Sequence, residues 1–274
     1  MKSKIPSKIN MVMGNPISQS KSPILHGRIY ELLKLDAVTI PVADSDVGKL
    51  VSKIRNESIG LTAVTMPFKK SVIPLLDHVD KTAKSINAVN TIINKNGKLF
   101  GYNTDIDGVR YALSDVPLKN KRVLLLGAGG AGHAVAHVVS EQKGKLIYLN
   151  RTAEESFNMA KKFTGQPAKE GELNAGDIDV IINATPVGMF PDVSSLSAPD
   201  KVIDKNKVVF DVVYSPLETK LLQVAEQRGA KTISGIDMFV AQGIRQIELW
   251  TNSNIINPGL VGRLKKIIIK KLTQ

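Results

Sequence analysis

The chain is 274 residues long, with 43% hydrophobic and 23% charged residues and a formal net charge of +12. This length suits one large domain or two moderate ones, and the proportions exclude an intrinsically disordered chain. The chain contains no cysteine, which excludes disulfides, a thiolate nucleophile and cysteine-ligated zinc and is consistent with a reducing compartment.

Short apolar runs alternate with segments of helical period through the first part of the chain. This pattern predicts strands at 9–13, 38–41 and 61–64 and helices at 23–33 and 45–55. Such alternation is typical of α/β architecture with mainly parallel sheets.

The pattern restarts near residue 105, where a helix over 105–114 is predicted. A final helical stretch begins after Gly235, and the strands expected before it lie at 123–126, 146–149, 180–183 and 208–213. We therefore place one domain boundary near Thr104 and another near Asp237. From the pattern alone, the final helices fit either the second domain or a return to the first.

A glycine-rich turn joins the predicted strand 123–126 to a helix expected over 131–140, and it consists of Gly127, Ala128, Gly129, Gly130, Ala131 and Gly132. This G-x-G-x-x-G spacing is typical of dinucleotide-binding folds. The first glycine permits the tight turn, the second lets the backbone approach a pyrophosphate, and the third lets the helix pack on the strand. The glycines alone fit any tight strand-to-helix turn, but the βαβ context favours a dinucleotide site.

The predicted strand 146–149 leads into Asn150, Arg151 and Thr152. NAD-dependent folds of this kind usually carry an acidic residue here, which binds the ribose hydroxyls. A guanidinium can instead pair with a 2′-phosphate, so the sequence favours NADP. The plainer interpretation is a solvated arginine beside a capping threonine, and the acidic residues Glu154 and Glu155 weaken the case for NADP.

Two serines, Ser20 and Ser22, stand at the start of the helix predicted near residue 23. Ser22 before Pro23 predicts an N-cap with proline in the first helical position, and Ser20 is not needed for that cap. Two hydroxyls beside a helix N-terminus can bind a carboxylate, so this segment is a candidate for substrate recognition.

Lys69 and Lys70 follow Pro67, where the sequence predicts that another helix begins. Cations in a first helical turn oppose the helix dipole. These lysines are therefore either surface residues or include an acid–base group.

Asn90 lies inside an apolar run over 88–93 that reads as a strand, where a buried amide must find hydrogen-bond partners or sit at a bulge. Asp105 follows Asn103 and Thr104 at the start of a predicted helix, so Thr104 or Asp105 fits a helix cap. A carboxylate near Lys69 would also hold the ammonium group in place and tune its proton affinity.

The four histidines do not have the spacing of a metal site. His133 and His137 are four residues apart on a predicted helix, but the sequence around them lacks the pattern of carboxylate ligands of a zinc centre, and the same holds for His26 and His78. We predict no metal site. The chain also lacks the G-x-S-x-G turn of serine hydrolases.

Taken in order, these segments resemble the motifs of the shikimate dehydrogenase family, which includes shikimate and quinate dehydrogenases. The similar segments span nearly the whole chain and lie at 13–23, 64–69, 88–91, 103–105, 127–132, 150–152, 183–189 and 238–242. So many motifs in the same order are far more specific than any single one of them.

The resemblance implies an α/β fold with two domains. A substrate-binding and catalytic domain would comprise 1–104 plus 238–274, so that the C-terminal helices return to it. A Rossmann-like doubly wound NADP domain would comprise 105–237. The implied activity is the reversible NADPH-dependent reduction of 3-dehydroshikimate to shikimate, in chorismate and aromatic amino-acid biosynthesis.

The resemblance also implies roles for single residues. Lys69 and Asp105 would be the catalytic pair that contacts the reacting oxygen. The substrate would be bound by Ser20, Ser22, Thr65, Asn90, Tyr214 and Gln242. The implied NADP-binding residues are Gly127, Ala128, Gly129, Gly130, Ala131, Gly132, Asn150, Arg151, Thr152, Thr185 and Gly235. The family often carries a basic residue near the position of Glu155, so this acid leaves the strength of the NADP preference open.

Three other functions stay open at this point. The chain could be a quinate or dual quinate/shikimate dehydrogenase that uses NAD(P), although the two serines favour shikimate. A folate-linked dehydrogenase of similar two-domain shape fits less well, because of the Ser20-Lys21-Ser22 and Asn103-Thr104-Asp105 motifs. A non-catalytic protein that binds NADP or nucleic acid is the alternative from another class.

The expected partner is a small-molecule substrate, with neither nucleic acid nor a membrane, and the chain is expected to be a monomer or homodimer. Its basic residues are scattered, and it lacks an aromatic platform for RNA. Residues 1–10 hold no apolar run, and no stretch approaches the roughly 18 apolar residues of a membrane helix. We therefore expect a cytoplasmic protein.

Overall fold

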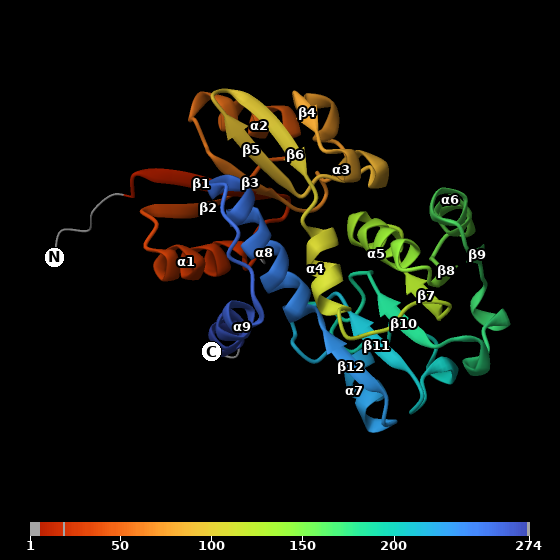
Figure 1. Ribbon diagram of the computed structural model, residues 1–274. Coiled ribbons are helices and arrows are strands. Elements are labelled where there is room, and N and C mark those ends of the chain that lie inside the picture. Colours follow the sequence, from red (N-terminus) through yellow and green to blue (C-terminus); the bar gives the residue numbers. More distant parts are fainter. Residues whose placement is uncertain (1–5, 19, 273–274) are drawn as a thin grey trace. The chain divides into compact units, whose positions relative to one another are not determined.

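The computed structural model of the chain describes residues 6–18 and 20–272 and is drawn in Figure 1. It divides into two compact units. Unit 1 comprises Met1–Asp107 and Val240–Ile268, and unit 2 comprises Gly108–Phe239 and Ile269–Gln274. Each unit contains one six-stranded sheet covered by helices. The predicted fold class, α/β with a Rossmann-like unit and C-terminal helices that return to the first unit, is confirmed.

The sheet of unit 1 has the strand order β2-β1-β3-β5-β6-β4. Its strands are β1 (Lys8–Gly14), β2 (Ala37–Ala43), β3 (Leu61–Val64), β4 (His78–Val79), β5 (Thr91–Lys95) and β6 (Lys98–Tyr102). β1 lies parallel to both β2 and β3, but β5 runs antiparallel to β3 and β6. Because β4 is parallel to β6, three of the five pairings are parallel and two are antiparallel, so the sheet is mixed and not parallel throughout. Asn96 and Gly97, both at positive φ, close a two-residue hairpin, which forces antiparallel pairing.

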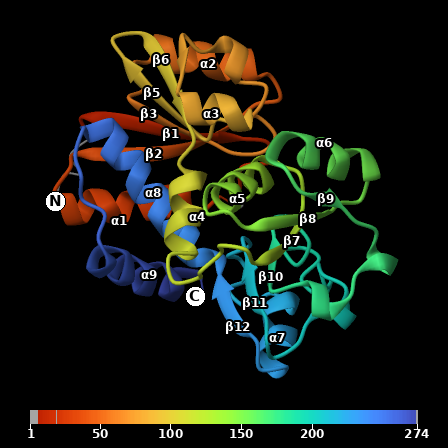
Figure 2. The same ribbon diagram turned by 45° about the vertical axis from the view of Figure 1, so that its right-hand side comes forward.

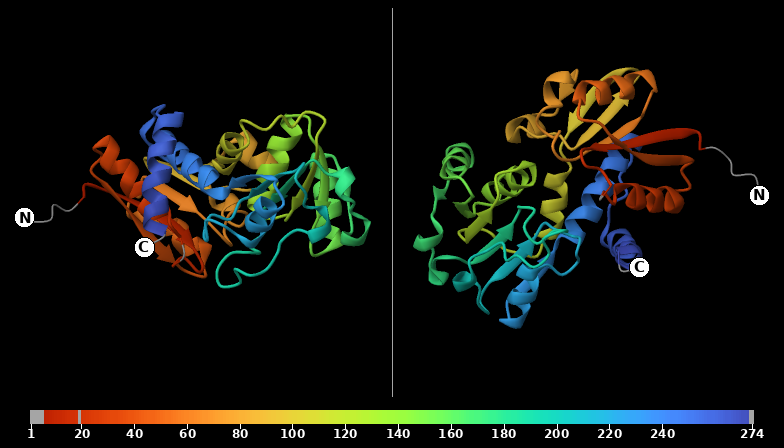
Figure 3. Two further views of the ribbon diagram at one scale, coloured as in Figure 1. Left: turned by 90° about the horizontal axis from the view of Figure 1, so that it is seen from below. Right: turned by 180° about the vertical axis from the view of Figure 1, so that it is seen from behind.

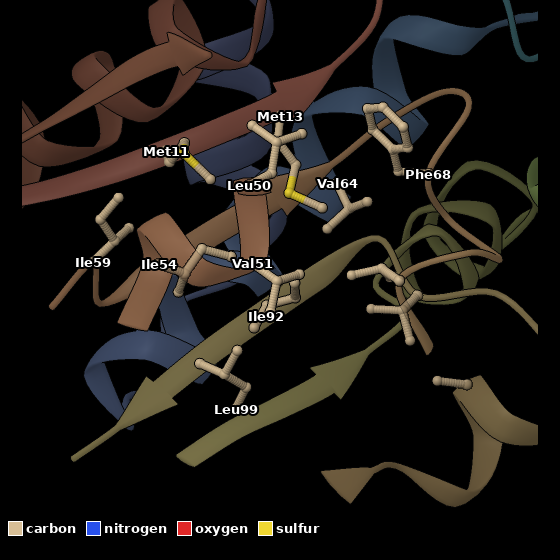
Figure 4. Close-up of a cluster of buried hydrophobic side chains, with 13 residues drawn as sticks. Met11, Met13, Leu50, Val51, Ile54, Ile59, Val64, Phe68, Ile92 and Leu99 are labelled. Carbon is tan, nitrogen blue, oxygen red and sulfur yellow. The ribbon is translucent and has the colours of Figure 1, made fainter. Parts of the chain in front are cut away.

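Helices cover both faces of this sheet, as Figure 2 and the right-hand view of Figure 3 show. The helices of unit 1 are α1 (Ser22–Leu33), α2 (Val47–Asn56), η1 (Ile73–Leu75), α3 (Lys81–Ile86), most of α8 (Gly235–Thr251) and most of α9 (Pro258–Leu272). Side chains alternate along β1: Met11 and Met13 pack with α2 in the core cluster of Figure 4, whereas Asn10 contacts Tyr30 of α1. The sheet therefore has an apolar face toward α2 and a face with buried polar groups toward α1 and α8.

Unit 2 is a parallel, doubly wound sheet with the order β12-β11-β10-β7-β8-β9. Its strands are β7 (Arg122–Leu126), β8 (Lys145–Leu149), β9 (Gln166–Pro167), β10 (Val180–Asn183), β11 (Val208–Asp211) and β12 (Lys231–Ser234). Its helices include most of α4 (Asp105–Ala112), together with α5 (Gly130–Glu141), α6 (Ala153–Phe163), η2 (Glu170–Glu172), η3 (Ala175–Asp177), η4 (Asp200–Val202) and α7 (Lys220–Gln227). The direction of winding reverses between β7 and β10, which is where open α/β sheets bind ligands.

The inner strands of unit 2, β7, β8, β10 and β11, are buried on both faces over most of their length, which explains their nearly continuous apolar sequences. Leu124, Ile181 and Val209, from three neighbouring strands, are fully buried in one core cluster. Parallel strands need apolar side chains on both faces, because the crossover helices pack on both sides of the sheet. This requirement made β7, β8, β10 and β11 the easiest elements to predict from the sequence.

Two predictions of secondary structure are wrong. No helix begins at Pro67: residues 66–72 form successive turns that lead into η1. Pro74 has no N–H to donate to Lys70, and its ring clashes with a helical carbonyl at that position, so a regular helix cannot continue through it. Asn90 does not lie within a strand, because β5 begins at Thr91. Its main chain is nevertheless hydrogen-bonded to the strands on both sides. Asn90 N donates to Tyr102 O of β6 at 3.0 Å, and Val64 N of β3 donates to Asn90 O at 2.7 Å.

Among the described residues, no helix is long and apolar enough to cross a membrane.

Candidate active site

Four polar segments of the first half of the chain, around Ser20, Lys69, Asn90 and Asp105, converge at one edge of the unit 1 sheet. β1 and β3 are parallel and end there, and the antiparallel strand β5 begins there, since Ala63 of β3 pairs with Thr91. β6 ends at the same edge, where Tyr102 also pairs with Thr91. The segments that carry Ser20, Lys69, Asn90 and Asp105 all connect to these strand ends, so residues far apart in sequence come together.

Lys69 and Asp105 form a close ion pair at this edge. The Lys69 Nζ donates to Asp105 Oδ2 at 2.6 Å, and the two side chains are 19% and 8% exposed. The backbone also holds Lys69, because Val89 N donates to Lys69 O at 2.8 Å. The pair is therefore a partly buried, pre-formed source of a proton donor and a carboxylate, and solvent reaches it mainly from the lysine side.

Asn90 holds the second oxygen of this carboxylate. Its Nδ2 donates to Asp105 Oδ1 at 2.9 Å and to Thr104 Oγ1 at 3.0 Å, and its Oδ1 accepts from Thr104 N at 2.7 Å. Because a backbone N–H can only donate, the orientation of the Asn90 amide is fixed with its NH₂ toward Asp105. Thr104 Oγ1 also lies 3.4 Å from Gln242 Oε1, which ties α8 to the same cluster.

The position of Lys69 differs from the predicted one. It lies in the turns after β3 and not in the first turn of a helix, so the expected opposition between its charge and a helix dipole is absent. Thr65 begins this loop, and its N donates to Met13 O at 2.9 Å, which anchors the loop to the end of β1.

Ser20 and Ser22 lie at the start of α1. Ser22 is the first residue of α1 and Lys21 occupies the N-cap position, so the prediction that Ser22 caps the helix is wrong. Instead, Ser22 N lies 3.4 Å from Ser20 Oγ, a long contact that places both serines at the N-terminus of α1. Gln19, between Ser18 and Ser20, lies outside the described residues.

The glycine motif of unit 2 has the geometry that a dinucleotide site needs. Gly127 has a φ of +103°, and a Cβ on Gly132 would lie 2.1 Å from Gly127 O, so neither position accepts a side chain. A Cβ on Gly129 would meet nothing within 4 Å. The N-terminus of α5 therefore opens toward free space beside Gly129, where its N–H groups can bind a pyrophosphate.

The predicted phosphate-binding residues follow β8, whose end is level with that of β7 because Leu126 pairs with Leu149. Arg151 and Thr152 are exposed. Thr152 is the N-cap of α6 but makes no side-chain capping bond, so its hydroxyl is not used for the helix. Glu154 and Glu155 are exposed in the first turn of α6, where the helix dipole stabilises acidic side chains.

Thr185 follows β10 at the same edge of the sheet and is held by Asn183. Thr185 N and Oγ1 donate to Asn183 Oδ1 at 3.0 and 2.6 Å. Gly235 lets the backbone at the start of α8 approach Val212 closely, since a Cβ on Gly235 would lie 2.2 Å from Val212 O. The ring of Tyr214 stacks on Phe239 with centroids 4.1 Å apart, which fixes its plane.

Behind Thr185 lies a buried carboxylate that the sequence analysis missed. Asp211 is fully buried and accepts from Asn183 Nδ2 at 2.9 Å, Val213 N at 3.0 Å and Thr219 Oγ1 at 2.6 Å. Burial raises the pKa of Asp211 from 3.8 to about 6, although these hydrogen bonds lower it. An acidic residue at the end of an apolar strand was the sequence signal that could have identified it.

His133 lies near the cofactor-binding turn and has a structural role. Its Nδ1 contacts Gly129 O at 2.9 Å, and its ring packs edge-on against Phe163. Within residues 6–18 and 20–272, no three histidine or acidic side chains are grouped so that they could hold a metal ion.

A doubly wound sheet with a glycine fingerprint, together with a unit that carries a Lys–Asp pair, is typical of nicotinamide-dependent oxidoreductases. Residues 12–92 match the family model described as the shikimate dehydrogenase substrate-binding domain, and residues 110–216 match that of shikimate/quinate 5-dehydrogenase. The chain belongs to the shikimate dehydrogenase family.

Individual relatives are similar over nearly the whole chain. It is 38% identical to shikimate dehydrogenase (NADP⁺) of Shouchella clausii over 88% of this chain and 91% of that protein. It is 37% identical to shikimate dehydrogenase (NADP⁺) of Bacillus cereus over 95% and 97%, respectively. The crystal structure of shikimate 5-dehydrogenase from Thermus thermophilus in complex with NADP(H) and shikimate superposes with a TM-score of 0.86 at 30% identity, over 94% of this chain and 98% of that one.

The raised pKa of Asp211 predicts how stability changes with pH. The folded protein binds a proton at Asp211 between pH 3.8 and about 6, where the unfolded chain does not. The free energy of unfolding therefore falls as pH rises through this window, by about 3 kcal/mol in total. Asp211→Asn removes this titration. In urea unfolding followed by circular dichroism, the variant should become more stable relative to the wild type by about that amount between pH 4 and pH 7.

Glu218→Gln is the matched control, because it removes an exposed carboxylate next to Thr219. Its difference from the wild type should stay within about 0.5 kcal/mol at every pH. A pH-independent difference for Asp211→Asn would mean that Asp211 does not take up a proton in this range.

Proposed function

We propose that the chain catalyses the reversible NADPH-dependent reduction of 3-dehydroshikimate to shikimate, a step of chorismate and aromatic amino-acid biosynthesis. The observation that carries this proposal is the 2.6 Å contact between Lys69 Nζ and Asp105 Oδ2 in a chain of this family. A non-catalytic binding protein would have no need of a partly buried ammonium group held at the meeting point of four strand ends.

Lys69 is the proton donor in the direction of reduction. When bound, NADPH supplies the hydride that adds to the ring carbonyl carbon. The Lys69 ammonium donates a proton to the carbonyl oxygen as negative charge develops there, and it accepts that proton in the reverse direction. Asp105 holds the ammonium group toward the reacting oxygen, and the exposed fifth of the Lys69 side chain gives it access to solvent protons.

The substrate is held by polar groups around this pair. Ser20 and Ser22 bind the carboxylate at the N-terminus of α1, where the positive end of the helix dipole adds to the attraction. Asn90 and Asp105 are already bonded to each other, so they present a fixed array to the ring hydroxyls. The remaining substrate-binding residues are Thr65, Gln242 and Tyr214.

NADP is the cofactor that fits unit 2. The open side of Gly129 and the N-terminus of α5 accept the pyrophosphate. The exposed Arg151 and Thr152 bind the 2′-phosphate, with Asn150 held beside them by its bond to Ser156 Oγ at 3.1 Å. Thr185 and Gly235 complete the cofactor-binding residues.

The two domains have separate tasks in this proposal. Residues 1–104 plus 238–274 bind the substrate and carry the catalytic pair, and residues 105–237 bind NADP. The protein is a monomer or homodimer in the cytoplasm that acts on a small molecule, without a nucleic-acid or membrane partner.

The proposed function is tested by measuring nicotinamide absorbance with shikimate and quinate, each with NADP and NAD. Shikimate with NADP should give the highest kcat/KM, because Ser20 and Ser22 are paired at the helix start and Arg151 is exposed. If quinate with NAD gives the highest value, the chain is a quinate dehydrogenase, a result that Glu154 and Glu155 beside Arg151 would then explain.

Arg151 should determine the preference between the cofactors. Arg151→Ala should weaken NADP binding by about 1.5–3 kcal/mol, or one to two decades in Kd, and leave NAD binding nearly unchanged. Titration calorimetry with both cofactors measures the difference. Equal losses would show that Arg151 has a structural role. Glu155→Arg should tighten NADP binding if this acid faces the phosphate.

Loss of Lys69 should reduce turnover much more than substrate binding. We expect Lys69→Ala to lower kcat by about two orders of magnitude or more, as for a lost general acid, with a smaller change in the Kd of shikimate. Asp105→Asn should cause a loss in the same range, and the double variant should be little worse than either single one, because the pair acts as a unit.

Lys69→Ala should also destabilise the protein by about 1–3 kcal/mol, because Asp105 keeps Asn90 but loses its counter-ion. A variant with near-normal kcat and a raised KM would contradict the proton-donor role and leave Lys69 as a binding residue.

A further inference from the structure

An unbroken chain of buried hydrogen bonds runs from β1 to the Lys69–Asp105 pair. Beyond Asn90 its members are Asn10, Tyr30, Thr39, His26, Gln246 and Thr91, and each of these is at most 5% exposed. They come from β1, α1, β2, α8 and β5, so the chain passes through the polar face of the unit 1 sheet. None of these six residues belongs to the predicted site, whereas Asn90 does.

The orientation of Gln246 follows from its partners. Its Nε2 donates to Asn90 O at 3.2 Å and to Thr91 Oγ1 at 3.0 Å. Because a main-chain carbonyl can only accept, the amide NH₂ must face Asn90, and the amide oxygen faces His26. Thr91 Oγ1 in turn donates to Asn90 Oδ1 at 2.8 Å. Gln246 therefore holds Asn90 through two routes, by its main chain and through Thr91.

This orientation fixes the tautomer of His26. Gln246 Oε1 lies 2.9 Å from His26 Nε2 and can only accept, so the hydrogen of the ring lies on Nε2. His26 Nδ1 then accepts from Thr39 Oγ1 at 3.1 Å. His26 is fully buried, and burial lowers its pKa from 6.5 to about 4, so the ring is uncharged at neutral pH.

The hydrogen bonds at the far end of this series, near β1, donate in the same direction. Leu61 N donates to Asn10 Oδ1 at 2.9 Å, which turns the Asn10 NH₂ toward Tyr30 Oη at 2.7 Å. With the Thr39 hydrogen directed to His26, the Tyr30 hydroxyl donates to Thr39 Oγ1 at 2.9 Å. Every link from Asn10 to Asn90 therefore donates toward the Asp105 carboxylate, and bonds aligned in this way polarise one another.

We propose that His26 and Gln246 are positioning residues that fix Asn90, and through it the Asp105 carboxylate, in the orientation needed for catalysis. This inference rests on the proposed function. Gln246 also lies one helical turn after Gln242 on α8, so its anchoring sets the position of that substrate-binding side chain. Neither His26 nor Gln246 contacts the reacting pair directly, so they act through Asn90 and Thr91.

Two substitutions of His26 distinguish its nitrogen atoms. The amide nitrogen of His26→Gln can take the place of Nε2 and donate to Gln246, whereas that of His26→Asn reaches only the place of Nδ1. We expect His26→Asn to lower kcat about tenfold with the KM for shikimate within about threefold of the wild type. His26→Gln should keep both values within about threefold. Equal kcat values in the two variants would overturn the proposal.

A second pair of variants keeps the test decisive if His26→Asn fails to fold. Thr91 and Thr62 are fully buried on the neighbouring strands β5 and β3, and among the described residues Thr62 Oγ1 has no hydrogen-bond partner. Thr91→Val should lower kcat about five- to tenfold, and Thr91→Ser, which keeps the hydroxyl, should restore it to within about twofold. Thr62→Val is the matched control and should leave kcat unchanged. Equal losses in both valine variants would indicate only a structural effect.

A measurement without turnover separates this inference from the proposed function. The chain has four histidines, so ¹⁵N spectra of histidine-labelled protein can be assigned with His26→Gln. His26 should show the neutral Nε2–H tautomer from pH 6 to pH 8. The Nδ1–H tautomer in an active enzyme would overturn the inference alone, whereas a wild type without activity on shikimate would overturn the proposed function and leave the tautomer result standing.

Discussion

The arrangement of unit 1 depends on the burial of one carboxylate. Asp105 is buried, with 5% of the whole residue exposed. A charge removed from water must be paired and hydrogen-bonded, or it destabilises the fold by several kcal/mol. Lys69 supplies the counter-ion to one oxygen and Asn90 the hydrogen bond to the other. Both partners must in turn be held in place, which explains why the loop after β3 and the start of β5 are tied by backbone bonds to β1 and β6.

The same requirement extends across the polar face of the sheet. Asn90 is satisfied by Thr104, Thr91 and Gln246, and these side chains need further partners because they too are buried. This series of hydrogen bonds ends only at Asn10, whose amide oxygen accepts from the main-chain N–H of Leu61. A network in which every polar group is satisfied favours a single arrangement of α1, α8 and the sheet, since any shift breaks several bonds at once.

Unit 2 follows a different constraint, the close approach of backbone segments at the edge where its strands end. Gly127, Gly132 and Gly235 each lie where a Cβ would meet a carbonyl oxygen at less than 3 Å. These contacts bring the end of β7, the start of α5 and the Thr185 turn together at the reversal of strand order. The buried Asp211 supports that turn through Asn183, so here also a carboxylate organises the loops of a binding site.

The sequence by itself determined the α/β class, the glycine fingerprint and most strands of unit 2, because these depend on local periodicity and on residues adjacent in the chain. The family resemblance supplied the proposed roles of Lys69 and Asp105, which spacing alone could not. The pairing of β5 with β3 and the bond between His26 and Gln246, 220 residues apart, were decided only by the tertiary structure. Strand order determines which polar groups meet and are buried together, and this long-range pairing leaves no local pattern in the sequence.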